Sequence, residues 1–264
     1  MKVGQGLTNK MSLEKGVVRK TSSPVVNYFL NRKAEAKLYQ QFQTLPDQDF
    51  YLKPLTWGFD LEQNFFSTWT YYPNSYTFLD QPEKLNDPTT LTAMINVIEG
   101  YHSLAVTMPL FEPRAYLNKF VTKIQNPLVD LASYQTELER IISQWYEPEF
   151  KVCLSHNDMV PGNFLFVDDQ LKLIDFEYSC FNLALFDYAG VISETLPANQ
   201  IKTFVELLAL SDKEKTKLKD LVFYAYLLWI NWATYMYENK QQPIYQEIVQ
   251  LMDQKLKNFA KLPF

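Results

Sequence analysis

The chain is poor in cysteine and glycine for its length of 264 residues, with two cysteines and seven glycines. Cys153 and Cys180 are too few for a disulfide framework in a chain of this size, and they do not form a C-x-x-C pair. We therefore expect a reducing, cytoplasmic environment, in which both thiols act as small buried hydrophobic side chains. No apolar leader follows Met1, so a secretory signal peptide is not expected.

An excess of positive charge is also missing. The chain has 25 Lys and Arg against 30 Asp and Glu, a net charge of -5. Nucleic-acid-binding domains usually carry a basic face, so this balance argues against nucleic acid as a partner. Hydrophobic residues make up 47% of the chain, enough to bury a sizeable core in one large domain or in two lobes.

An uncharged run of seventeen residues, 221–237, raises the question of a membrane span. The run is shorter than the usual length of about 20 apolar residues. It also contains Asn231 and Thr234 and is rich in Tyr and Trp. We predict a buried core helix and no stable membrane insertion, with a membrane-anchored protein as the alternative.

Residues 154–188 are the most informative stretch of the chain. A short apolar run leads into the polar cluster at 156–158, and Asn163 follows five residues after Asp158. Two apolar runs joined by residues 168–170 predict a β-hairpin, and the second run ends at Asp175. The pattern is a carboxylate on a loop, an amide, a hairpin and a second carboxylate.

This order of groups suits phosphoryl transfer from a nucleotide. One carboxylate orients the attacking hydroxyl, while an amide oxygen and a second carboxylate hold Mg²⁺ on the phosphates. The spacing H-x-D-x-x-x-x-N, followed by D-F, is that of the kinase catalytic loop and metal-binding turn. We predict Asp158 as the catalytic carboxylate, Asn163 and Asp175 as magnesium ligands, and ATP as the donor. An ordinary polar turn before a hairpin is the alternative, and the coincidence of two motifs disfavours it.

Two phrases in this stretch, HNDMVPGNFLF and LIDFEYSCFNLALFDYA, resemble the choline/ethanolamine kinase family of the aminoglycoside-phosphotransferase superfamily. Asn157 stands where protein kinases have Arg, which points to small-molecule kinases. IDFEY and FDYA are more typical of choline kinases than of antibiotic kinases, and the bacterial phosphorylcholine-pathway choline kinases are similar in length.

The resemblance implies an α+β, protein-kinase-like fold with two lobes. We expect a small antiparallel-sheet lobe at 1–70 that binds nucleotide, and a larger, mostly helical lobe at 71–264 that carries catalysis and substrate binding. The implied reaction is ATP- and Mg²⁺-dependent phosphorylation of the choline hydroxyl to phosphocholine.

The N-terminal stretch holds two of the seven glycines, Gly4 and Gly6, before a predicted strand at 7–10. Glycines placed together favour a loop whose backbone approaches a ligand closely. GLTNK resembles the family's flap over the ATP phosphates, which implies that Gly4, Gly6, Thr8 and Asn9 lie at the nucleotide.

A basic residue is then expected on the following strand, 17–20. Arg19 and Lys20 point to opposite faces of a strand, so one of them can reach the phosphates. The family often has Arg here, and we predict Arg19. Its acidic partner is predicted as Glu35, on a helix at 31–42 that resembles the family's Asn-Arg-Glu-x-Glu phrase. An exposed-helix glutamate is the alternative for Glu35.

The substrate candidates are aromatic. Trp229 and Trp232 are three residues apart in a predicted helix at 215–238, which places both indoles on one face. Such a wall suits a quaternary ammonium, although a Trp pair on an apolar helix is more often core. The resemblance implies that these residues, with Tyr178 and Glu194, line a choline site.

Several alternatives stay open at this point. The same fold serves kinases for ethanolamine, thiamine or aminoglycosides, and Glu194 would also suit the primary ammonium of ethanolamine. A pseudokinase-like binding protein is the alternative outside enzymes, and intact Asp158, Asn163 and Asp175 argue against it. No motif specifies an oligomeric state.

Further elements are expected from periodicity and from turn and cap residues. The predicted strands are 50–57 and 65–71, and the predicted helices are 87–101, 114–124, 128–145, 186–194, 199–210 and 245–260.

Overall fold

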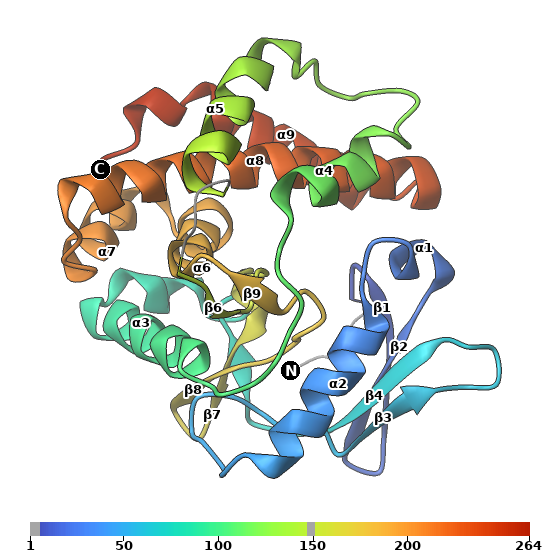
Figure 1. The fold of residues 1–264 in the computed structure, drawn as a ribbon. Coiled ribbons are helices and arrows are strands. Elements are labelled where there is room, and N and C mark those ends of the chain that lie inside the picture. The colour runs from blue at the N-terminus through green and yellow to red at the C-terminus, as the bar shows by residue number, and fades with distance from the viewer. Residues whose placement is uncertain (1–5, 147–150) are drawn as a thin grey trace. The chain divides into compact units, whose positions relative to one another are not determined.

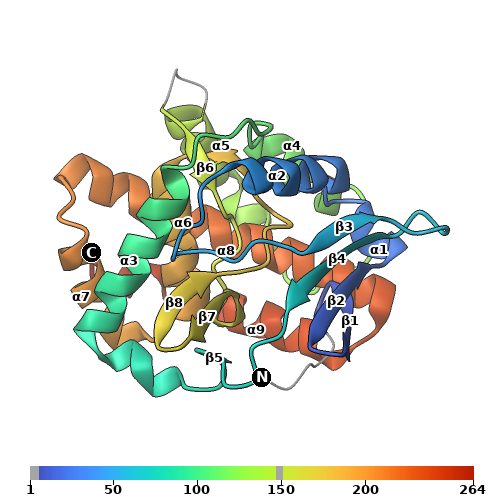
Figure 2. The same ribbon diagram turned by 90° about the horizontal axis from the view of Figure 1, so that it is seen from below.

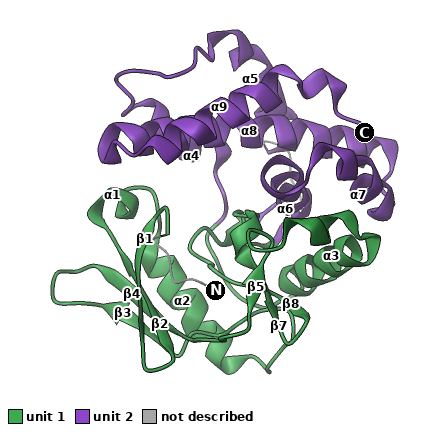
Figure 3. Ribbon diagram, turned by 180° about the vertical axis from the view of Figure 1, so that it is seen from behind, with its two compact units in different colours: residues 1–109, 154–181 green, residues 110–153, 182–264 purple. Residues whose placement is uncertain are grey.

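The computed structural model describes residues 6–146 and 151–264 (Figure 1). The chain forms two compact units, one of residues 1–109 and 154–181, the other of residues 110–153 and 182–264 (Figure 3). This partition differs from the division at residue 70 that the sequence suggests, and that division stays a prediction. Gly4 lies outside the described residues.

The first unit begins with an antiparallel sheet of four strands in the order β1-β2-β4-β3. The strands are β1 (Asn9–Glu14), β2 (Val17–Ser22), β3 (Thr56–Phe59) and β4 (Phe65–Thr70). Lys15 and Gly16 join β1 to β2 with φ of 49° and 77°. Positive φ at both central residues is typical of a tight two-residue hairpin turn. In β2 the buried face carries Val18, Lys20 and Ser22. Because side chains alternate between the two faces of a strand, Lys20 points to the buried face and Arg19 to the other.

Helices α1 (Pro24–Asn27) and α2 (Arg32–Thr44) follow the hairpin. Asn31 caps α2, since its side chain accepts a hydrogen bond from the N–H of Ala34 at 3.1 Å. Figure 2 shows α2 alongside the four-stranded sheet. The ring of Tyr39 packs there against Phe65 and Trp69, with centroid separations of 6.2 and 5.5 Å. The predicted helix at 31–42 is confirmed.

The predicted strand at 50–57 is wrong over most of its length. The strand starts at Thr56, and of the residues before it Tyr51 pairs with Leu173 in an isolated bridge. The Tyr51 ring lies against Phe42 and Phe176, at centroid separations of 4.6 and 6.2 Å. The apolar residues of this segment thus reflect the burial of the Tyr51 ring. They do not reflect strand pairing along the whole segment.

The rest of the first unit includes the segment 154–181. Its elements are β5 (Tyr76–Thr77), η1 (Pro82–Asn86), α3 (Pro88–His102), η3 (Pro161–Asn163), β7 (Phe164–Val167) and β8 (Gln170–Leu173). β5, β7 and β8 form a sheet, and β6 (Cys153–Ser155) pairs with β9 (Cys180–Asn182). The predicted hairpin is confirmed: Asp168 and Asp169 join β7 to β8 with φ of 49° and 60°. Asp87 caps α3 as expected.

The second unit is helical. Its elements are α4 (Pro113–Val121), η2 (Ala132–Tyr134), α5 (Gln135–Trp145), α6 (Ala184–Gly190), η4 (Val191–Thr195), η5 (Ala198–Gln200), α7 (Ile201–Leu207), α8 (Asp212–Lys240), α9 (Pro243–Lys257) and η6 (Phe259–Lys261). The helix expected from 128 starts later, because the Asp130 side chain accepts the N–H of Ala132 and makes a local turn.

Helix α8 is the core of the second unit. Residues 221–230 are buried on every side, which confirms the predicted core helix. A capping box starts the helix, with the side chains of Ser211 and Glu214 each bonded to the other's backbone N–H. In the described ranges, no helix is both long and apolar enough to cross a membrane. Neither Cys153 nor Cys180 is in a disulfide in the described residues, and both are half-buried, less than expected.

Replacing Asn31 by Ala removes the side chain that caps α2. We expect this change to lower the free energy of unfolding by about 1 kcal/mol, and Asn31→Gly to lower it by only a few tenths. Urea unfolding followed by far-UV circular dichroism measures both. Asn31→Asp keeps the acceptor and serves as the control; equal losses in all three variants would contradict the capping role.

Candidate active site

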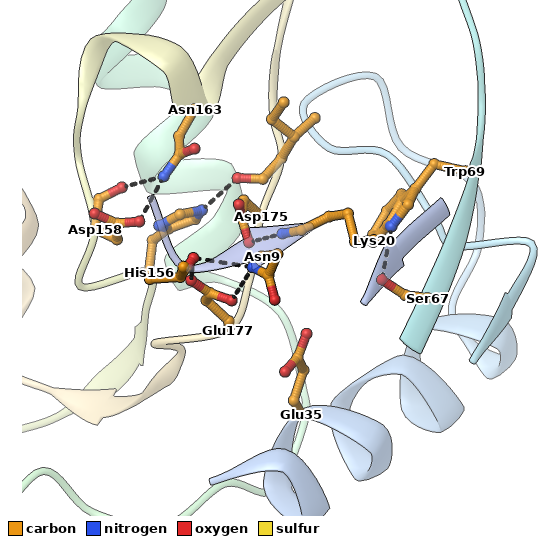
Figure 4. Close-up of polar contacts among 12 residues, drawn as sticks. Asn9, Lys20, Glu35, Ser67, Trp69, His156, Asp158, Asn163, Asp175 and Glu177 are labelled. Carbon is orange, nitrogen blue, oxygen red and sulfur yellow. Dashed lines mark hydrogen bonds and ion pairs between the residues drawn. The ribbon is translucent and has the colours of Figure 1, made fainter. Parts of the chain in front are cut away.

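The catalytic loop lies after β6 and is fixed by its own polar side chains. Nδ2 of Asn163 donates to the backbone carbonyl of Asp158 at 2.9 Å and to its carboxylate Oδ2 at 2.8 Å (Figure 4). The 3₁₀ turn η3 places Asn163 for these bonds. Because the amide nitrogen is used by Asp158, the amide oxygen faces elsewhere and can serve a cation.

Backbone contacts tie this loop to the turn that carries Asp175. Nε2 of His156 donates to the carbonyl of Ile174 at 2.9 Å, and the N–H of Ile174 donates to the carbonyl of Asn163 at 3.1 Å. Asn157 has φ of 63° and donates to the carbonyl of Tyr178 at 3.1 Å. His156 and Asn157 therefore shape the loop.

Asp175 has φ of 69° and forms an ion pair with Lys20, whose side chain reaches it from β2 (Figure 4). The structure places Lys20 beside Asp175, and the predicted phosphate residue Arg19 does not join this group. The Arg19 guanidinium lies over the Phe66 ring, 3.9 Å from its centroid. The buried face of β2 includes Lys20, so Arg19 is turned to the other face of the strand.

Glu177, two residues after Asp175, is a buried acceptor that sequence reasoning missed. It accepts hydrogen bonds from Thr8 Oγ1 at 2.6 Å, from Asn9 Nδ2 at 2.7 Å and from Arg32 Nη1 at 3.0 Å. The predicted nucleotide residues Thr8 and Asn9 thus direct their side chains to a carboxylate. A glutamate beside Asp175 in the IDFEY phrase was the clue available in the sequence.

Glu35 is paired with Arg32, not with the residue predicted as its partner. Arg32 Nη1 lies 2.7 Å from Glu35 Oε2, and the Tyr39 hydroxyl donates to Oε1 of the same carboxylate at 2.8 Å. Both Arg32 and Glu35 are buried. The alternative of an exposed glutamate is therefore excluded, and Arg19 is not the ion-pair partner of Glu35.

Gly6 follows Gly4 in the predicted nucleotide loop. A Cβ built on Gly6 would lie 3.2 Å from the backbone oxygen of Asn9. The neighbouring backbone would have to yield to any larger residue. This close approach is a reason for glycine within the loop itself.

The charge balance of these residues is negative. Four carboxylates (Glu35, Asp158, Asp175 and Glu177) accompany two cations (Lys20 and Arg32). Burial, with the nearby charges of Asp175 and Glu177, raises the pKa of Asp158 to about 8. Burial alone would also raise the pKa of Glu177, but Arg32 and Lys20 hold it down to about 2.

This donor set fits Mg²⁺. Hard oxygen ligands and excess negative charge are what the ion prefers, and Asn163 and Asp175 supply an amide oxygen and a carboxylate. Within residues 6–146 and 151–264, no group of three or more His, Cys, Asp or Glu forms a metal site by itself. Mg²⁺ that is bound through one or two protein oxygens together with substrate phosphates needs no such group.

The aromatic candidates lie mostly in the second unit. The Trp229 and Trp232 rings are perpendicular at 5.7 Å, so both indoles share one face of α8 as predicted. Tyr245 of α9, which the sequence did not single out, packs edge-on against Trp232 at 5.8 Å. Tyr178 lies in the first unit and stacks on Phe29 at 6.3 Å.

Glu194 stands on the π-helical turn η4, half-buried, in the same unit as the two tryptophans. The N–H of Leu196 donates to the carbonyl of Val191 at 2.9 Å, closing this wide turn. Lys255 of α9 donates to the carbonyl of Ser193 at 2.7 Å and anchors the turn next to Glu194. Irregular helical turns of this kind are frequent at functional sites.

The chain is similar in sequence to known proteins. The family profile described as choline/ethanolamine kinase matches residues 12–257. Protein LicA of Haemophilus influenzae is 31% identical over 140 residues, which cover 51% of this chain and 52% of that protein. The matched region therefore spans about half the length of this curated relative.

Solved structures show the same fold over nearly the whole chain. LicA choline kinase from Streptococcus pneumoniae has a TM-score of 0.76 at 18% identity, covering 97% of this chain and 91% of its own. A structure of LicA in complex with AMP also gives 0.76, at 19% identity, covering 97% of this chain and 90% of that one. The GDP complex of aminoglycoside 2′-phosphotransferase-IIIa gives 0.64 at 15% identity, covering 97% and 91%.

The fold is the α+β, protein-kinase-like fold of small-molecule kinases, with an antiparallel sheet near the N-terminus and mostly helices after it. Within that class, the chain belongs to the choline/ethanolamine kinase family.

Two neighbouring basic residues test the correction on β2. Lys20→Met should weaken nucleotide binding or turnover at least tenfold, because it removes the cation beside Asp175. Arg19→Met should change either quantity much less, because Arg19 packs on Phe66. Calorimetric titration with ADP and Mg²⁺ compares the two variants, and a larger loss in Arg19→Met would restore the original prediction.

Proposed function

We propose that this protein is an ATP-dependent choline kinase, which transfers the γ-phosphoryl group to the choline hydroxyl and gives phosphocholine. The observation that carries the proposal is the grouping of Asp158, Asn163, Asp175 and Lys20 in the first unit of a choline/ethanolamine kinase family member. In kinases these residue types orient the hydroxyl, hold the metal and bind the phosphates.

In this proposal Asp158 accepts the hydroxyl proton and directs the oxygen towards the phosphorus. Asn163, bonded to Asp158 through its nitrogen, and Asp175 offer oxygens to the metal. Bound Mg²⁺ would supply charge neutralisation on the transferred phosphoryl group. Lys20 adds a positive charge beside Asp175, where phosphate oxygens would be bound.

The loop before β1 has an indirect role in this proposal. Gly6 allows the loop backbone to pass close to the backbone oxygen of Asn9. The side chains of Thr8 and Asn9 donate hydrogen bonds to Glu177. These two side chains therefore order the end of the loop through Glu177. Use of a nucleotide is supported by the LicA complex with AMP.

The cation would be bound by the aromatic group of α8 and α9. Indole and phenol rings attract a quaternary ammonium by about 0.5–2 kcal/mol per contact. Trp232 is buried, and its indole N–H has no acceptor among the described residues, which a fully packed core would avoid. Glu194 of the same unit adds a negative charge, and the predicted role of Tyr178 stays a prediction. The neighbour named as a choline kinase supports the same substrate.

Ethanolamine is the second candidate acceptor, and Glu194 is the observation that favours it. A carboxylate can accept hydrogen bonds from a primary ammonium, whereas a quaternary ammonium has no N–H to donate. A coupled ATP assay with choline, ethanolamine, thiamine and an aminoglycoside separates these acceptors. The cytoplasmic location expected from the two cysteines belongs to the same proposal.

Asp158→Asn should abolish turnover while the protein stays folded, since the amide keeps the shape but cannot accept the proton. We expect kcat to fall by at least 100-fold, in line with the usual effect of losing a general base. Asp168→Asn, at the exposed tip of the β7–β8 hairpin, is the matched control. Normal choline phosphorylation by Asp158→Asn would overturn the assignment.

Trp232→Leu tests the aromatic site. The change should raise KM for choline by roughly tenfold with a smaller effect on kcat, because it removes a cation–π contact. Trp145→Phe is a control in the same unit, where the indole N–H instead donates to Asp220 at 2.6 Å. Equal KM values in wild type and Trp232→Leu would assign Trp232 to the core.

A further inference from the structure

Arg32 occupies an unusual place for a cation. It is the first residue of α2, directly after the capping Asn31. The N-terminus of a helix is the positive end of its dipole and disfavours a positive side chain. Arg32 is nevertheless buried there, with 6% of its surface exposed. Strong partners must offset both the burial and the dipole.

Those partners are two carboxylates on separate parts of the first unit. Arg32 Nη1 lies 2.7 Å from Glu35 Oε2 and 3.0 Å from Glu177 Oε2. Arg32 Nη2 donates to Asn9 Oδ1 at 3.2 Å, and Nε donates to Asn27 Oδ1 at the same distance. One guanidinium therefore links α2, the start of β1 and the segment after β8.

Glu177 is held by three side chains. Its two carboxylate oxygens receive bonds from Thr8, Asn9 and Arg32. Asp175 is two residues earlier and has the left-handed φ of 69°. A chain this short between the two carboxylates passes any movement of Glu177 on to Asp175.

We propose that Arg32 is the positioning residue of the metal-binding turn, holding Glu177 so that Asp175 presents its carboxylate to the metal of a metal–nucleotide complex. Glu35 and Tyr39 fix the other side of the guanidinium. The polar connection from α2 to the metal-binding turn therefore runs through Arg32 and Glu177, beside the ring contact of Phe42 with Phe176 at 5.2 Å, and Lys20 meets Asp175 separately. This inference rests on the proposed kinase function.

Lysine does not replace arginine at such a site. The planar guanidinium spans two carboxylates and two amide oxygens at once, whereas an ammonium is a compact point charge on a flexible stem. Arg32→Lys keeps the charge and loses part of this geometry. Arg32→Met removes both and leaves Glu35 and Glu177 without their cation.

The test measures how much Mg²⁺ improves ADP binding. Isothermal titration gives the Kd of ADP without and with Mg²⁺, and the ratio is the magnesium gain. We expect the gain to fall about tenfold or more in Arg32→Met, the usual effect of losing a residue that orients a metal ligand. Arg32→Lys should show a smaller fall, and ADP affinity without metal should change little in either variant.

Arg140 provides a matched control in the second unit. It also contacts two carboxylates, at 2.7 Å from Glu137 and 2.6 Å from Asp220. Arg140→Met should lower the thermal unfolding temperature and leave the magnesium gain at the wild-type value. Arg32→Met/Glu35→Gln should recover part of the stability of Arg32→Met without recovering the magnesium gain.

Different results would overturn the positioning role of Arg32 and the proposed kinase function. Wild-type magnesium gain in both Arg32→Lys and Arg32→Met overturns the positioning role, as does a gain restored in step with stability in the double variant. If Arg32→Met does not fold, Arg32→Lys decides the matter alone. Absence of Mg²⁺-dependent ADP binding in the wild-type protein overturns the proposed function, and the inference with it.

Discussion

The buried charge balance of the first unit is the constraint on which its other features depend. Carboxylates that phosphoryl transfer requires are gathered there, and burial, together with the nearby charges of Asp175 and Glu177, raises the pKa of Asp158 to about 8. Lys20 and Arg32 offset part of this charge, and each makes a direct ion pair. Removing one partner of a buried ion pair typically costs about 3–5 kcal/mol, because the remaining charge stays buried. The strand β2 and the helix α2 are thus tied to the catalytic segment by charge as well as by apolar packing.

Most of the catalytic segment could be predicted because its information is local. The spacing from Asp158 to Asn163, the hairpin with Asp168 and Asp169 at its tip, and the position of Asp175 all follow from short-range patterns, and the structure has them as expected. The parity of β2 could not be read in this way. Val17 and Val18 are both apolar, and only packing against the rest of the unit decides that Val18 and Lys20 share the buried face. A shift of one residue on a strand exchanges its two faces, so the predicted Arg19 and the buried Lys20 lie on opposite faces of β2.

Arg32, Glu177 and Tyr245 are not predictable from the sequence for a different reason. Arg32 and Glu177 are 145 positions apart, and their pairing exists only after the chain has folded. The same holds for Tyr245, which meets Trp232 through the packing of α9 on α8. Glu35 is an ion-pair residue as predicted, but its partner is Arg32, three residues before it on the same helix. Local sequence patterns therefore predict the carboxylates Glu35, Asp158 and Asp175, but not the charged residues that pair with them.

The division of the chain between its two units has a practical consequence for truncation. It passes from one unit to the other after Pro109, after Cys153 and again after Phe181, so each unit consists of two separate stretches of sequence. No truncation at a single position releases either unit whole, and a fragment ending near residue 110 lacks the catalytic loop altogether. A polypeptide that holds either unit whole must therefore contain both of its stretches of sequence.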